Sequence, residues 1–150
     1  RFDRQRLDID ADPAVAEARF TPLVLDQKAH PYVTVRLGEV SANAVWDTGA
    51  SLTVVDLNFI RAHAAHFSAA GHSIGTDANG TQVETAMYLM DTAQIGERTF
   101  PPHRVAAVDL SPINAAIEIP MDLIVGYNLY SQANWLFDFP NRRWAFTYIF

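Results

Sequence analysis

Short runs of apolar and β-branched residues, separated by turn-forming residues, recur along most of this 150-residue chain. Alternation of this kind, rich in Val and Thr, predicts strands rather than helices. Strands are expected at residues 20–25, 32–37, 40–46, 92–95, 103–108 and 121–125, with a last hairpin formed by 133–139 and 142–149. Roughly nine strands in one chain indicate an all-β fold, a small barrel or folded sheet with one or two short helices.

A change of period sets residues 56–70 apart from the strands around them. Leu57, Ile60, Ala64 and Phe67 fall on one face at helical spacing, which predicts a helix over this range. The Asp at position 56 is a suitable N-cap for that helix, and the Gly at position 71 would end it.

A hairpin is predicted over residues 72–90, because Asn79-Gly80 is a strong signal for a tight turn between two strands. Apolar residues at positions 74, 83, 87 and 89 flank this turn. Residues 110–120 are expected to form a loop, since prolines at positions 112 and 120 disfavour regular structure.

Length and charge limit the kinds of partner that this chain can have. The length predicts one folded domain at 20–150, preceded by a charged arm or linker at 1–19. A net charge of −6 argues against nucleic acid or anionic membrane as the main partner. The chain has no Cys, which excludes thiol catalysis and disulfides, and it has no apolar run long enough to cross a membrane. Because it begins at Arg1 without a signal-like stretch, we expect a trimmed or processed fragment.

One motif carries the chemistry: Asp47-Thr48-Gly49-Ala50-Ser51 follows the 40–46 strand and occurs once. The Gly permits a sharp turn that brings backbone N–H groups close to the carboxylate, and such donors favour its charged form. Two carboxylates about 3 Å apart share one proton, so that one acts as a base toward water and the other as an acid toward a carbonyl. The chain supplies one copy, so a second chain or a second domain has to supply the other.

With its flanking residue, Trp46-Asp47-Thr48-Gly49-Ala50-Ser51 resembles the active-site motif of retropepsin-like aspartic proteases, and Ile124-Val125-Gly126-Tyr127-Asn128-Leu129 is similar to their second signature. The hairpin around Asn79-Gly80 stands where that family has its flap. Phe137-Asp138-Phe139 and Trp144-Ala145-Phe146 are similar to the terminal strands of bacterial members. The resemblance covers about residues 20–149 and implies a retropepsin-like acid protease barrel with a single lobe.

The resemblance also implies roles for individual residues. Asp47 would be the catalytic carboxylate, Thr48 would bond across a twofold axis to its counterpart, and Gly49 would orient the carboxylate through its N–H. Ser51 would hydrogen-bond the outer carboxylate oxygen. Gly126 would let the second loop pack beneath the active-site turn. The residues expected on the substrate side, where the hairpin would close as a lid, are Ala50, Asn79, Gly80, Thr81 and Gly126.

The function implied is that of an aspartic endopeptidase, in which Asp47 from two chains forms a dyad around a water and hydrolyses peptide bonds in extended polypeptides. No metal or organic cofactor is expected, and the expected partners are a peptide or protein substrate and a second copy of the chain. Tyr127 departs from the pattern, since viral members often carry an Arg there that pairs charges in their dimer. Bacterial members are often exported or membrane-tethered, which favours a periplasmic or other extracytoplasmic location.

Three alternatives keep part of this pattern. A catalytically silent peptide-binding or dimerisation module would have the same fold, although it would not need an intact Asp47, Gly49 and Ser51. One half of a tandem two-domain protease would take its second carboxylate from a domain outside this chain. In an unrelated β protein, Asp47 would be a structural turn residue.

Plainer roles are expected for other chemically suggestive residues. Asp91-Thr92-Ala93 mimics the motif but lacks its Gly, so Asp91 is expected on the surface. Neither His63 nor His66 belongs to a His-Glu-x-x-His zinc motif, so an exposed helix face is favoured. Asp122 and Asp138 are expected in turns or facing outward. The spacing of Asp8, Asp10 and Asp12 is that of a calcium loop, but the pattern fails at Pro13 and Arg19. The three tryptophans, Trp46, Trp135 and Trp144, are expected in the core or an interface.

Overall fold

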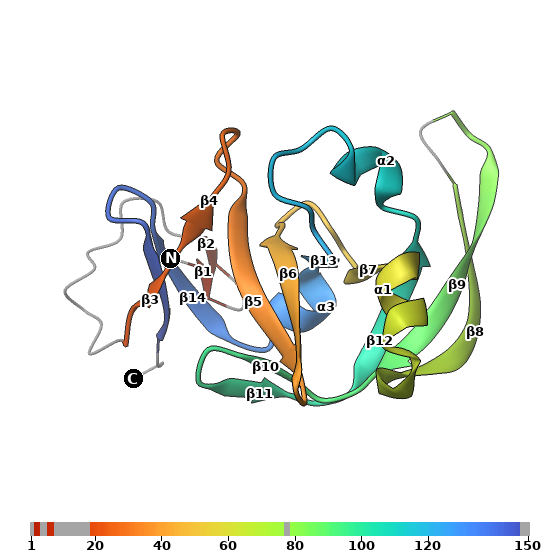
Figure 1. Ribbon diagram of the computed structural model, residues 1–150, viewed down its shortest axis with the longest axis horizontal. Coiled ribbons are helices and arrows are strands. Elements are labelled where there is room, and N and C mark those ends of the chain that lie inside the picture. Colours follow the sequence, from red (N-terminus) through yellow and green to blue (C-terminus); the bar gives the residue numbers. More distant parts are fainter. Residues whose placement is uncertain (1, 4–5, 8–18, 77–78, 148–150) are drawn as a thin grey trace.

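A computed structural model describes residues 2–3, 6–7, 19–76 and 79–147 (Figure 1). Short strands make up most of it, as the alternation in the sequence predicts. The strands are β1 Phe2–Asp3, β2 Arg6–Leu7, β3 Thr21–Pro22, β4 Val24–Leu25, β5 Pro31–Leu37, β6 Val40–Trp46, β7 Val54–Asp56, β8 Phe67–Thr76, β9 Gln82–Met90, β10 Ala93–Ile95, β11 Arg98–Phe100, β12 His103–Val108, β13 Leu123–Val125, β14 Asn134–Asp138 and β15 Arg143–Thr147. The helices are α1 Leu57–Ala62, the 3-10 turn Ala64–His66, α2 Ser111–Asn114 and α3 Tyr127–Tyr130.

These strands form two sheets. The larger has the order β11-β10-β5-β6-β13-β7-β12-β9-β8, with β4 paired to β5, and the smaller has the order β2-β1-β14-β15-β3. In Figure 1 the smaller sheet lies at the left and the β8–β9 hairpin projects at the right. Two strand pairs are parallel, β6 with β13 and β7 with β12. A parallel pair needs a long connection, so each of them brings together segments that are distant in the sequence.

Trp135 joins the two sheets at the centre of the hydrophobic core. It lies on β14 of the smaller sheet, has no exposed surface, and its ring centroid is 5.8 Å from that of Trp46 on β6. The rings of Phe146 and Trp144 on β15 lie 4.6 Å and 5.5 Å from it. Burial of a large apolar side chain contributes roughly 1.5–3 kcal/mol to stability. The prediction that the three tryptophans belong to the core is therefore confirmed.

The helix predicted over 56–70 is much shorter than expected. α1 ends at Ala62, and after a 3-10 turn the chain enters β8 at Phe67, whose backbone pairs with Met90. The Phe67 side chain is buried against Phe59, so the chain fills the predicted apolar face from a strand instead of a helix. Gly71 does not end a helix: it has a φ of +82° at an irregularity in the β8–β9 pairing. Long-range pairing here outweighs a local helical period.

Four other segments differ from the sequence-based expectation in detail. Residues 20–25 form two short strands in different sheets, and 2–3 and 6–7 in the charged N-terminal segment pair with one another and with β14. The expected loop at 110–120 contains α2, and residues 98–100 form β11, which was not predicted. The calcium-loop spacing in the N-terminal segment begins at position 8 and lies outside the described residues.

The hairpin predicted over 72–90 is present in the described residues. β8 and β9 pair antiparallel from Phe67↔Met90 to Thr76↔Gln82, with a register shift between Ala69 and His72. The turn between them includes 77 and 78, which lie outside the described residues. β8 is the last strand of its sheet, so one of its edges has no strand partner among the described residues. An edge of this kind offers backbone donors and acceptors to another extended chain.

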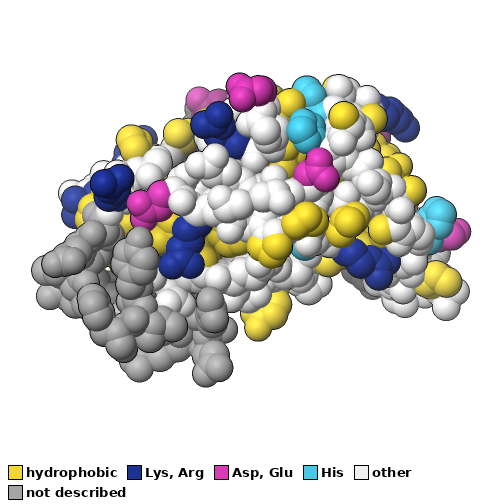
Figure 2. Space-filling view, turned by 90° about the horizontal axis from the view of Figure 1, so that it is seen from below, with side chains coloured by type: hydrophobic (Ala, Val, Ile, Leu, Met, Phe, Trp, Pro, Cys, Tyr) yellow, Lys and Arg dark blue, Asp and Glu magenta, His cyan; other side chains and the backbone are white. Residues whose placement is uncertain are grey.

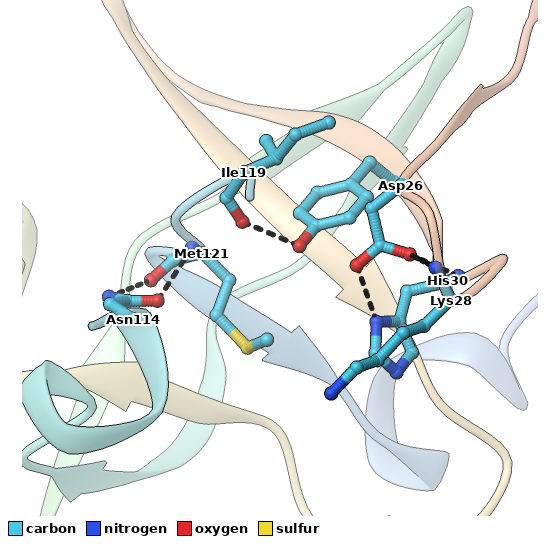
Figure 3. Close-up of polar contacts among 7 residues, drawn as sticks. Asp26, Lys28, His30, Asn114, Ile119 and Met121 are labelled. Carbon is cyan, nitrogen blue, oxygen red and sulfur yellow. Dashed lines mark hydrogen bonds and ion pairs between the residues drawn. The ribbon is translucent and has the colours of Figure 1, made fainter. Parts of the chain in front are cut away.

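The loop between β12 and β13 is held down by paired hydrogen bonds (Figure 3). Asn114 donates to the carbonyl of Met121 and accepts from its N–H, each at 2.9 Å. The hydroxyl of Tyr32 on β5 donates to the carbonyl of Ile119 at 2.6 Å. These contacts seat Met121 and Leu110 against Tyr32 in a second, smaller apolar cluster.

A buried carboxylate organises the turn between β4 and β5. Asp26 accepts from the N–H groups of Lys28 and His30 at 2.9 Å, and its second oxygen lies 2.6 Å from His30 Nδ1 (Figure 3). Burial by itself raises the pKa of Asp26, but the hydrogen bonds and charge of His30 outweigh it, so the pKa falls below its usual value. The ionised form of Asp26 therefore stabilises this turn.

No helix in the described part of the chain is long and apolar enough to cross a membrane. The face in Figure 2 carries side chains of both charge signs, with apolar side chains between them.

We expect Asp138 to make the folded state sensitive to acid. Its carboxylate accepts from Asn141 and from Arg143 Nε, the latter at 2.7 Å, and these two groups hold its pKa below the usual 3.8. A lowered folded-state pKa stabilises the fold above the unfolded-state pKa, and that stability is lost as the pH falls through the folded-state value. Wild type should therefore have a higher urea midpoint than Asp138→Asn at pH 6, and the gap should close as the pH falls below 3.8 and through the lower folded-state pKa. A gap that stays constant across this range would contradict the assignment.

Candidate active site

The candidate site begins with a tight turn at the end of β6. The N–H of Gly49 donates to Asp47 Oδ1 at 2.8 Å, and the Asp47 N–H donates to the carbonyl of Val125 at 3.2 Å. Asp47 is half-buried, and its neighbours Thr48 and Gly49 are exposed. A Cβ at Gly49 would lie 3.2 Å from Asp47 Oδ1, so glycine lets the turn close onto the carboxylate. The result is an accessible carboxylate with a fixed orientation.

Strand pairing places a second loop beside this turn. β6 and β13 run parallel with Trp46 opposite Val125, so both strands end at the same level of the sheet. Beyond them the chain turns at Asp47 on one side and at Gly126 on the other. β7, which follows the Asp47 turn, pairs antiparallel with β13 and completes this arrangement.

Gly126 is buried where the two loops touch. A Cβ on this residue would lie 2.4 Å from the carbonyl carbon of Leu52 and 2.7 Å from the nitrogen of Thr53. The next residue, Tyr127, donates its N–H to the carbonyl of Ala50 at 2.8 Å. The structure therefore brings the predicted Gly126 directly against the segment that follows Asp47.

A buried hydrogen-bond network ties α3 to the same segment. Asn128 Oδ1 accepts from both the N–H and the hydroxyl of Thr53, at 2.8 and 2.9 Å, and the Thr53 hydroxyl accepts from the Gly126 N–H at 3.2 Å. Asn128 Nδ2 donates to the carbonyl of Arg104 on β12 at 2.7 Å. Sequence reasoning gave neither Thr53 nor Asn128 a role of its own, although Thr53 follows the first motif by two residues and Asn128 lies within the second. Their positions next to and within the two motifs were the available signals.

Tyr130 also reaches the turn and was not predicted to do so. Its hydroxyl donates to the carbonyl of Thr48 at 3.2 Å, and its side chain is almost wholly buried. Burial raises the pKa of Tyr130, with smaller contributions from Tyr127 and from the charge of Asp47. The phenol is therefore held in its neutral, hydrogen-donating form close to the carboxylate.

Other predicted site residues are not joined to Asp47. Ser51 is exposed, and within the part of the chain that the structure describes no hydrogen bond links its hydroxyl to the Asp47 carboxylate. Asn79, Gly80 and Thr81 are exposed near the turn of the β8–β9 hairpin, which stands apart from the end of β6 in Figure 1. The roles of these four residues stay predictions.

The other three Asp residues considered from the sequence all lie away from the Asp47 turn and make structural contacts. Asp91 is exposed, with its carboxylate 3.3 Å from His66 Nδ1. Asp122 accepts from the N–H of Asn43, while burial and the nearby Asp56 raise its pKa. Asp138 stabilises the turn between β14 and β15, as described above. None of the three lies on the turn at the end of β6.

A metal centre finds no support in the described residues. No group of three His, Asp or Glu side chains comes close enough together there to hold a metal ion. His66 contacts the exposed carboxylate of Asp91, and the ring of His63 packs against Phe59 at 4.6 Å between centroids. Both histidines therefore have ordinary surface or packing contacts.

Comparison with known proteins agrees with this geometry. A family model described as "Aspartyl protease" matches residues 33–129, well over half of the chain and a range that contains both loops. No curated protein matches the chain significantly. A retropepsin-like aspartic protease from Rickettsia conorii is similar in structure, with a TM-score of 0.56 and 13% sequence identity over 87% of this chain and 91% of that one. The retropepsin-like resemblance and the all-β fold class are confirmed, and the chain belongs to the aspartyl protease family.

Proposed function

We propose that this protein is an aspartic endopeptidase whose active site forms from two copies of Asp47, one from each chain of a homodimer. The observation that carries the proposal is the geometry of the turn. The Gly49 N–H holds one carboxylate oxygen, and the carboxyl group remains accessible at the joined ends of β6 and β13. An Asp that only stabilised its turn would also make this local bond, but among the described residues no hydrogen bond engages the second oxygen of Asp47.

Chemically, the pair would act on a water bound between the two carboxyl groups. The ionised carboxylate takes a proton from the water as its oxygen attacks the carbonyl carbon of the peptide bond, and the protonated carboxyl gives its proton to the carbonyl oxygen. The tetrahedral intermediate then collapses: the carbon–nitrogen bond breaks as the first carboxyl gives the nitrogen the proton it took from water. The second carboxylate takes back a proton from a hydroxyl of the intermediate, and a carboxylic acid and an amine leave. The two carboxyl groups exchange acid and base roles during the cycle, so the proposed reaction needs no metal or cofactor.

The case for a second copy is the presence of one Asp-Thr-Gly-Ala-Ser motif in the chain. Thr48 and Gly49 are exposed beside the carboxylate, and the neighbouring Tyr127 side chain is 51% exposed. This face can be covered by the same face of another chain about a twofold axis. With Tyr127 in place of a charged residue, the contact would be less sensitive to salt than one built on ion pairs.

The proposed substrate is an extended polypeptide that lies beneath the β8–β9 hairpin. β8 is an edge strand, and Ile74 and Val83 on the two strands are exposed despite being apolar. Exposed apolar side chains beside unpaired backbone groups suit the binding of an extended chain, with the main chain giving affinity and the side chains giving specificity. Closure of the hairpin would exclude water from the reacting bond.

The test combines sedimentation equilibrium with digestion of a peptide library. If the site needs two chains, specific activity should fall roughly tenfold for each tenfold dilution below the dimer dissociation constant. Adding an excess of Asp47→Asn chains to wild type should suppress cleavage through mixed dimers. A monomer that cleaves with constant specific activity would contradict the shared site. A stable dimer that never cleaves would favour a peptide-binding module.

A further inference from the structure

The peptide group between Thr48 and Gly49 is hydrogen-bonded at both ends. Its N–H belongs to Gly49 and donates to Asp47 Oδ1 at 2.8 Å. Its carbonyl belongs to Thr48 and accepts from the Tyr130 hydroxyl at 3.2 Å. Because a peptide group is planar, its C=O and N–H move together. Any group that fixes the carbonyl of Thr48 therefore also fixes the direction of the donor that reaches the carboxylate.

Tyr130 is itself firmly placed. Its ring lies 4.9 Å from the ring of Trp46, the residue before Asp47, and its own carbonyl accepts from Trp135 Nε1 at 2.8 Å. Trp135 has no exposed surface and is the central residue of the core. The hydroxyl of Tyr130 is thus carried to the turn by a side chain anchored in the hydrophobic core.

Packing does not account for the hydroxyl. The ring fills the space beside Trp46, and a phenylalanine ring would fill the same space. Burial of a hydroxyl costs free energy that a single hydrogen bond offsets with only a small net gain. What the hydroxyl adds is polarisation of the Thr48–Gly49 peptide group, because hydrogen bonds that are linked in a chain polarise one another.

We infer that Tyr130 is a positioning residue of the active site, which orients and polarises the Thr48–Gly49 peptide group so that its N–H stabilises the ionised Asp47. For catalysis, the inference rests on the proposed function of Asp47. For the titration of the carboxyl group alone, it needs no catalytic activity.

The experiment replaces the hydroxyl and keeps the ring, with Tyr130→Phe. We expect the titration curve of the Asp47 carboxyl carbon, followed by carbon-13 NMR, to move about 0.3–0.7 unit to higher pH. In peptide cleavage, kcat should fall roughly 3- to 10-fold with KM unchanged, and the acidic limb of the pH profile should move in the same direction. An unmoved titration curve and pH profile would overturn the inference.

The matched control is Tyr32→Phe. It removes a hydroxyl that also donates to a backbone carbonyl, that of Ile119, so it tests the loss of a similar bond away from the turn. The Asp47 titration should be unchanged in this variant; an equal shift in both variants would overturn the inference. If wild type does not cleave peptides at all, the proposed function fails, yet the NMR titration still decides the role of Tyr130.

A second measurement applies if Tyr130→Phe does not fold. In wild type, ionisation of Tyr130 at high pH turns its hydroxyl into a group that cannot donate. The nitrogen-15 signal of Gly49, detected through the carbonyl carbon of Thr48 because exposed amide protons exchange too fast at this pH, should then shift in step with the ring signals of Tyr130. A Gly49 signal that stays unchanged through that ionisation would overturn the inference.

Discussion

Asp47→Asn is expected to reduce kcat/KM for peptide cleavage by about 10³-fold or more, because the amide can neither take a proton from water nor share one with a second carboxyl. The substitution keeps the shape of the side chain, and its oxygen can still accept from the Gly49 N–H, a bond of 2.8 Å in the native turn. The fold should therefore survive. Cleavage assays on purified protein, with circular dichroism as the check on folding, measure both quantities.

The control for that experiment is Asp91→Asn. Asp91 opens the Asp-Thr-Ala sequence that imitates the motif, but its side chain is exposed and, among the described residues, its carboxylate pairs with His66 Nδ1 at 3.3 Å. An exposed pair of this kind contributes little, so activity should remain within about twofold of wild type. Activity of Asp47→Asn within tenfold of wild type would rule out Asp47 as the catalytic carboxylate.

Gly126→Ala is expected to lower the free energy of unfolding by more than about 3 kcal/mol. The substitution removes no interaction, so the whole effect would come from the steric clash of the added methyl group. The added methyl would lie 2.4 Å from the carbonyl carbon of Leu52 and 2.5 Å from its oxygen. Both atoms belong to the backbone, so no side chain can rotate out of the way. To make room, the Gly126 loop would have to separate from the segment after Asp47. Urea unfolding followed by fluorescence gives the change in free energy.

Gly75→Ala supplies the comparison. Gly75 lies on β8, its φ is not in the left-handed region, and no atom outside its neighbours lies within 4 Å of an added methyl. Its stability should remain within about 0.5 kcal/mol of wild type. If Gly126→Ala unfolds at the same urea concentration as Gly75→Ala, the close contact between the two loops is not a constraint on this protein.

The sequence predicted the strands well where local alternation decides the structure. Residues 40–46 and 103–108 were predicted with the bounds that β6 and β12 have, because their alternating apolar side chains face one core. The helix beyond Ala62 was not predicted correctly. Phe67 fits a helical face and a strand equally well, and its pairing with Met90 makes the choice. Local periodicity cannot reveal that Phe67 pairs with Met90, because the two residues are far apart in the sequence.

The candidate site likewise has residues that a local motif predicts and residues that only long-range contacts bring in. Asp47, Gly49 and Gly126 follow from motifs, because each motif lies within one short segment. The contacts of Thr53 with Asn128 and of Tyr130 with Thr48 join positions 75 and 82 residues apart. Single side-chain bonds over such separations leave no periodic trace in the sequence, so they could be found only once the two loops were seen together.

The parallel pairing of β6 and β13 also decides when the site can exist during synthesis. The motif at 47–51 leaves the ribosome before the groups that hold its turn, on Val125, Tyr127 and Tyr130, which are made about half a chain length later. A nascent chain that stops before residue 121 thus contains the whole motif and none of these supports. Contacts of such high sequence separation also slow folding, since a long loop has to close before they form. The turn that orients the carboxylate therefore gains these supports only after the segment through Tyr130 has been synthesised, which keeps a shorter nascent chain from presenting a finished site.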